Sequence, residues 1–187
     1  GAGGVRAWGV VLWKWVWGGR RVWVAASSHA PDETVAIAAQ VRVLEADPDA
    51  LLIVVPRLPE RGAEVCAALD AAGLRYGQRS TGQDVKAVHQ VYVADTLGEL
   101  GLWYRVAQVA LVGGSFGETQ GHNPWEAITL GCPVVSGPMT DNFAADYAQL
   151  QEAGLAPVSY THPPLPANDP VVVCVRRRYV QNKQTSQ

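Results

Sequence analysis

With 187 residues, 48% of them hydrophobic, the chain is long enough for one domain with a substantial core, and its net charge of −2 gives no indication of a nucleic-acid partner. Its three cysteines have no short paired spacing, which argues against a zinc site or a disulfide framework and fits a reducing compartment. No apolar run approaches the roughly 20 residues that a membrane-spanning helix needs, so we expect a soluble, cytoplasmic chain.

Residues 1–20 are rich in glycine and carry tryptophans at every second position, namely Trp13, Trp15 and Trp17. We expect a frayed segment or linker that leads into the domain. The alternative is an edge strand with its tryptophans on one face, because a period of two is the period of a strand.

Apolar runs and helical patterns alternate over residues 21–157. We expect strands at 22–26, 51–55, 88–94, 109–112 and 133–135, and helices that begin at Pro31 and Pro59 or cover 97–105, 123–130 and 142–153. Continuous apolar strands are typical of a parallel sheet that is covered on both faces. The pattern therefore predicts an α/β fold, a Rossmann-like doubly wound parallel sheet with right-handed crossovers.

The composition changes abruptly after Pro157, where a proline-rich stretch leads to three consecutive arginines and a polar end. We expect residues 158–187 to be a non-native or disordered tail, and we leave them out of the functional interpretation. A genuine proline-rich terminal arm is the alternative.

The most informative segment follows the strand at 109–112 and reads GGSFGETQGHNPWEAITLGCPVV. Its glycines let the backbone approach a ligand closely. The helix that follows offers unpaired N–H groups and the positive end of its dipole to an anion. A strand, loop and helix of this kind are where an α/β domain holds a phosphate or a carboxylate.

Together with three further segments, this stretch resembles the donor-side half of the 3-deoxy-D-manno-octulosonic acid (Kdo) transferases. The further segments are 25–29, 55–61 and 95–100, and they occur in the family's order. The resemblance implies one half of a B-fold glycosyltransferase that transfers Kdo from CMP-Kdo to lipid A precursor in lipopolysaccharide core biosynthesis, without a cofactor. It makes residues 21–157 the CMP-Kdo binding domain.

Members of this family also carry an N-terminal membrane anchor and a first Rossmann-like domain that binds the acceptor. We therefore expect this chain to be the C-terminal domain, inactive alone, of an enzyme at the cytoplasmic face of the bacterial inner membrane. The family's catalytic glutamate lies in that first domain, so we assign no catalytic residue here. The acidic residues are not clustered, so we expect no metal site.

Arg57 follows the strand at 51–55 and so lies at the carboxyl end of a parallel strand, where open α/β sheets bind ligands. Its planar guanidinium suits a pair of phosphate oxygens, and the resemblance implies the same role. The alternative is a surface salt bridge to Glu60 or Glu64. Leu58 stands where the family has a histidine, so the function of that histidine is lost or supplied elsewhere.

Asn123 and Glu126 have the spacing of a helix capping box, with Pro124 at the first helical position. That interpretation explains the spacing without a ligand. The resemblance implies instead that Glu126 holds the ribose hydroxyls and that Asn123 lies near the donor phosphate. Both can be partly true, because capping residues line the mouth of the same helix.

Five other residues complete the expected donor-binding set. Gly114 and Ser115 would offer backbone N–H groups and a hydroxyl to the donor. His122 is either a donor to phosphate or an ordinary loop residue. Ser27 and His29 end the first strand, and a histidine there can reach a carboxylate or a leaving phosphate.

Two other functions remain open. One is a B-fold glycosyltransferase with a UDP- or GDP-sugar donor, which would also place a glutamate at the helix mouth but does not predict His-Asn-Pro or Pro-Arg. The other is a non-catalytic nucleotide-binding fragment that holds CMP and transfers nothing.

Overall fold

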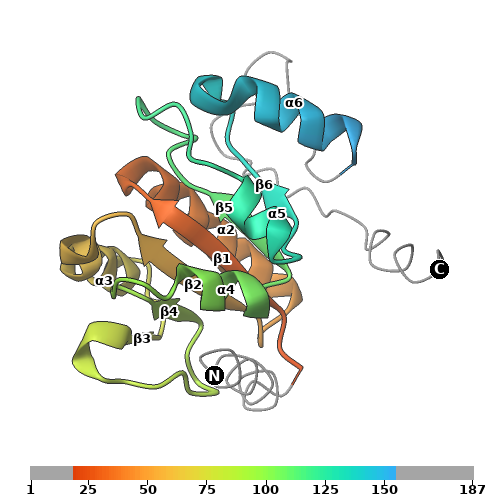
Figure 1. The fold of residues 1–187 in the computed structure, drawn as a ribbon. Helices are drawn as coiled ribbons and strands as arrows, with labels where there is room; N and C mark the ends of the chain where they lie inside the picture. The colour runs from red at the N-terminus through yellow and green to blue at the C-terminus, as the bar shows by residue number, and fades with distance from the viewer. Residues whose placement is uncertain (1–18, 155–187) are drawn as a thin grey trace, which may run out of the picture.

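A six-stranded sheet organises residues 19–154, the part of the chain that this computed structural model describes (Figure 1). Its strands are β1 (Val22–Ser28), β2 (Leu51–Pro56), β3 (Tyr76–Gln78), β4 (Val91–Val93), β5 (Val109–Val112) and β6 (Val134–Val135). Its helices are α2 (Ala30–Ala46), α3 (Gly62–Ala71), α4 (Leu100–Val106), α5 (Trp125–Thr129) and α6 (Ala144–Glu152). Short 3₁₀ turns occur at Pro59–Arg61, Arg79–Thr81 and Asp141–Phe143.

The strands are ordered β3-β4-β2-β1-β5-β6, and every neighbouring pair is parallel. The chain places β2, β4 and β3 on one side of β1 and then places β5 and β6 on the other. The order therefore reverses between β1 and β5. This arrangement confirms the predicted α/β fold with a doubly wound parallel sheet.

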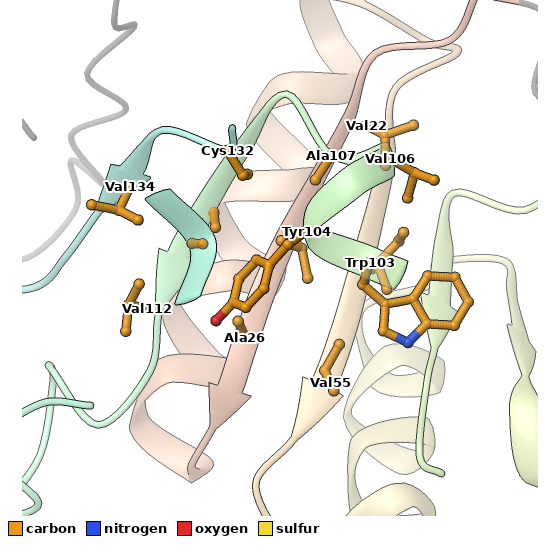
Figure 2. Packing of buried hydrophobic residues seen from close by; sticks show 14 of the residues in the cluster. Val22, Ala26, Val55, Trp103, Tyr104, Val106, Ala107, Val112, Cys132 and Val134 are labelled. Carbon is orange, nitrogen blue, oxygen red and sulfur yellow. The ribbon is translucent and has the colours of Figure 1, made fainter. Parts of the chain in front are cut away.

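Alternating strand residues pack against helices on opposite faces of the sheet. Val24 and Ala26 of β1 belong to a cluster with α4, α5 and α6, whereas Ala25 belongs to a cluster with α2 and α3. Figure 2 shows the first cluster, in which Trp103 and Tyr104 of α4 cover the sheet. Burial on both faces is the reason that the strands read as continuous apolar runs.

Short elements differ most from the prediction. The edge strand β3 was not predicted, because its three residues, Tyr-Gly-Gln, form no apolar run. The strand expected over 88–94 is limited to Val91–Val93, and Val88 is 59% exposed. The helix expected at 123–130 covers only Trp125–Thr129.

The two ends of the chain are described only in part. The segment expected to be frayed contributes Gly19 and Arg20, and the Arg20 guanidinium donates hydrogen bonds to the carbonyl oxygens of Asp49 (2.7 Å) and His89 (2.5 Å). The tryptophans before it and the tail expected at 158–187 lie outside the described residues. Within residues 19–154, no helix is long and apolar enough to cross a membrane.

Candidate functional site

The carboxyl ends of β1 and β5 lie side by side where the strand order reverses. The two strands pair in register from Trp23 with Val109 to Ala26 with Val112. Open α/β sheets bind ligands in the crevice outside such strand ends. Two segments with predicted site residues start here: the turn into α2, and the loop of residues 113–122 after β5, which we call the glycine loop.

His29 from the first segment and His122 from the second form a hydrogen-bonded pair. Their Nε2 atoms are 2.8 Å apart, and their rings stack with centroids 5.0 Å apart and planes inclined by 19°. One nitrogen must donate a proton and the other must accept it, so at least one of the two rings is neutral while this bond exists. The fold thus joins two predicted site residues that are 93 positions apart.

The charge of this histidine pair depends on its neighbours. Burial lowers the pKa of His122, and the nearby His29 and Arg57 lower it further, whereas Asp32 acts in the opposite direction. His122 is therefore neutral at pH 7, and the Arg57 guanidinium lies near enough to act on it. Neutral imidazole N–H groups beside a guanidinium suit an anionic ligand.

Arg57 itself is exposed and follows β2, and its backbone N–H donates to the carbonyl oxygen of Ser28 at the end of β1 (2.9 Å). The salt-bridge alternative is not realised. Glu64 is paired with Arg61 (2.6 Å), and no ion pair within residues 19–154 involves Arg57. The guanidinium is therefore available to a ligand.

Gly114 and Ser115 are hydrogen-bonded within the chain itself. The backbone N–H groups of Gly114, Ser115 and Phe116, which we call the N–H nest, all donate to the buried carboxylate of Asp32. The Ser115 hydroxyl is buried, donates to the Val112 carbonyl and accepts the Gly137 N–H. The chain itself therefore already binds the groups that were expected to face the donor.

At the start of α5 the expected capping box is not formed: the N-cap position is Pro124, and no side chain caps the helix. Asn123 Oδ1 accepts the N–H of Trp125 (2.9 Å), but the Glu126 carboxylate accepts no hydrogen bond from any residue in the described part of the chain. Glu126 is exposed, and its charge adds to burial in raising the pKa of Tyr104. The capping interpretation of Glu126 is wrong, and its carboxylate is open to solvent.

Ser27 lies at a β-bulge, where the register between β1 and β2 shifts between Ala26 and Ser28. Its φ of 52° is rare for a residue other than glycine. A Cβ on Gly113 would collide with the Ser27 carbonyl oxygen, so the two chain segments approach here as closely as glycine allows. The Ser28 hydroxyl donates to Glu33 (3.1 Å) and does not cap α2.

Two buried acids in the first turn of α2, Asp32 and Glu33, also belong to this region and were not among the predicted site residues. Glu33 pairs with Arg61 (2.7 Å), and this hydrogen bond is the main reason that the pKa of Arg61 is raised. Their position directly after a strand end that was predicted to bind a ligand was the feature of the sequence that could have marked them as site residues. That position does not show which N–H groups or cations the two carboxylates bind.

The chain is similar to enzymes of two bacteria. It is 42% identical over 142 residues to the 3-deoxy-D-manno-octulosonic acid transferase of Bordetella pertussis and 36% identical over 141 residues to that of Haemophilus influenzae. These matches cover 74% and 75% of this chain but 33% and 32% of the two relatives, so the chain spans about a third of their length. No family model matches the chain.

A solved structure matches more evenly. The crystal structure of the C-terminal CMP-Kdo binding domain of WaaA from Acinetobacter baumannii superimposes with a TM-score of 0.74 at 38% sequence identity. The match covers 79% of this chain and 78% of that one.

Proposed function

The chain belongs to the 3-deoxy-D-manno-octulosonic acid transferase family, and we propose that residues 21–157 are the donor-binding half of a B-fold glycosyltransferase that uses CMP-Kdo. The observation that carries this proposal is the similarity over most of both chains to a domain named for CMP-Kdo binding. The position of the histidine pair and Arg57 at the reversal of strand order supports it independently.

The chemistry of the donor matches the polar groups at this edge of the sheet. CMP-Kdo carries a phosphodiester and a carboxylate, both anionic, and a ribose diol. We assign the anionic groups to Arg57, His29 and His122, with Ser27 and Asn123 beside them. We assign the ribose hydroxyls to Glu126, because its free carboxylate can accept two hydroxyl protons. Gly114 shapes the floor beneath His122, and Ser115 is left out of the contact set.

The proposal extends to the activity of the whole protein. Together with an acceptor-binding domain such as its longer relatives would supply, we propose that the chain takes part in transfer of Kdo to lipid A precursor, at the cytoplasmic face of a bacterial inner membrane. Two free buried thiols, Cys66 and Cys132, are consistent with a reducing compartment. The CMP leaving group would be stabilised by the cationic edge of the donor site.

Isothermal titration of the 187-residue chain with CMP, UDP and GDP tests the donor class. We expect CMP to bind at least about tenfold more tightly than either alternative, a difference of about 1.4 kcal/mol. Equal or tighter binding of UDP would refute the assignment to CMP-Kdo and favour another nucleotide-sugar donor.

Incubation of the chain with CMP-Kdo and lipid A precursor tests transfer separately. We expect no transfer by this chain alone, because no described residue is assigned as the base that activates the acceptor hydroxyl. Measurable transfer would show that the base lies within this sequence.

A further inference from the structure

Asp32 is the most fully engaged carboxylate near the donor site, and it is only 1% exposed. Its Oδ2 accepts the backbone N–H groups of His29 (2.8 Å) and Gly114 (2.8 Å). Its Oδ1 accepts those of Ser115 (3.2 Å) and Phe116 (3.2 Å). One side chain in the first turn of α2 therefore joins the turn after β1 to the glycine loop after β5.

The hydrogen bonds of Asp32 connect it to both members of the histidine pair. Oδ2 holds His29 directly through its N–H. On the other side it holds Gly114, whose carbonyl oxygen accepts the N–H of Gly121 (2.8 Å), the residue before His122. A Cβ on Gly114 would lie 3.0 Å from His122 Cδ2, so the His122 ring packs directly on this glycine.

Successive backbone N–H groups that point into one concavity form a binding site for an anion. In this chain the anion is already supplied by Asp32. A ligand anion that approaches the strand ends finds the N–H nest filled, and the polar groups left open to it are the histidine pair and Arg57. Asp32 thus directs the anion outward, toward the rim of the site.

We infer that Asp32 is a positioning residue of the donor site. Its carboxylate fills the N–H nest of the glycine loop and so holds His29 and His122 in contact with each other. This histidine pair then binds the donor's anionic groups. This inference rests on the proposed function for its ligand, but the geometry of the histidine pair can be tested without any ligand. The charged groups that act on His122 are Asp32 from α2 and Arg57 from the loop after β2, together with His29 when that ring is protonated.

The first experiment compares Asp32→Asn with Glu33→Gln. Glu33 is the matched control, because it is also buried in the first turn of α2 but its carboxylate binds Arg61 and Ser28 and makes no hydrogen bond to the glycine loop. The amide introduced by Asp32→Asn would present its NH₂ group toward at least one backbone N–H group of the nest, so that contact becomes repulsive. NMR then follows the contact between the His29 and His122 rings, and calorimetry follows CMP.

In the unmodified chain we expect nuclear Overhauser contacts between the two rings, and we call this ring-to-ring contact the coupling of the pair. In Asp32→Asn we expect this coupling to be lost and CMP affinity to fall by about tenfold or more. In Glu33→Gln the coupling should persist and affinity should change by no more than about twofold. Coupling that persists in folded Asp32→Asn would overturn the inference, whereas failure of the unmodified chain to bind CMP would overturn only the proposed function.

A second measurement needs no variant and remains decisive if Asp32→Asn does not fold. Amide hydrogen exchange of residues 114–116 is recorded in the unmodified chain with and without CMP. We expect these amides to be protected before CMP is added and to change little afterwards. Amides that exchange freely and become protected only with CMP would show that the ligand fills the nest, which contradicts the inference.

Discussion

Replacement of Arg57 by alanine is the perturbation that separates a ligand-binding arginine from a structural one. The side chain is exposed, and it makes no ion pair within residues 19–154. Its backbone N–H, which donates to Ser28, is kept in alanine. We therefore expect the free energy of unfolding to change by no more than about 0.5 kcal/mol, as for other surface substitutions away from special features.

The effect on CMP should be much larger than the effect on stability. A hydrogen bond between a charged donor and a phosphate contributes about 1.5–3 kcal/mol, which corresponds to a loss of affinity of about 10- to 150-fold. The structure also predicts a change in the free chain. Because Arg57 contributes to the lowered pKa of His122, its removal should raise that pKa.

Calorimetry with CMP, urea denaturation and NMR titration of His122 measure the three effects. Arg105→Ala is the matched control, since Arg105 is an exposed arginine near the end of α4 whose guanidinium donates to the Gly101 carbonyl oxygen of its own helix. It should leave CMP affinity and the pKa of His122 unchanged. A ligand-binding role of Arg57 is excluded if Arg57→Ala lowers stability by several kcal/mol with unchanged CMP affinity, or if Arg105→Ala weakens CMP equally.

Two further predictions concern Glu126 and two histidines, the buried His89 and the half-buried His122. Glu126→Gln should lower the affinity for CMP by about tenfold, because an amide offers only one acceptor oxygen to the ribose diol. The affinity for 2′,3′-dideoxy-CMP should hardly change. Equal losses of affinity for both nucleotides in calorimetry would remove Glu126 from the site. Burial is the main cause of lowered pKa values for both His89 and His122, so the unfolded chain binds more protons than the folded chain as the pH falls through the ordinary value of 6.5. The free energy of unfolding should therefore decrease from about pH 7.5 to about pH 5.5, and urea titrations should show a flatter dependence when both histidines are replaced by glutamine; a rise over this range would contradict the burial of neutral rings.

The alternation of apolar runs with helical patterns was sufficient to predict the parallel α/β sheet. Runs such as Leu51–Val55 are apolar at every position because the strand is buried on both faces, and this constraint is visible locally. The same logic placed Arg57 at the carboxyl edge. Local patterns failed for β3, which contains a glycine and two polar-ended side chains and is held in the sheet by its pairing with β4.

Patterns in the sequence were therefore sufficient to predict the fold class and the family, and they pointed to the edge of the sheet where the candidate site lies. Packing between distant segments sets which polar groups of that edge meet one another. His29 and His122 contact because β1 and β5 are neighbours in the sheet, and Asp32 takes the N–H nest because the first turn of α2 lies beside the glycine loop. Strand order and the direction of a buried side chain arise from packing between distant segments. Local spacing of residues therefore could not reveal that Asp32 of the same chain accepts hydrogen bonds from the glycine-loop amides, which were expected to bind a ligand.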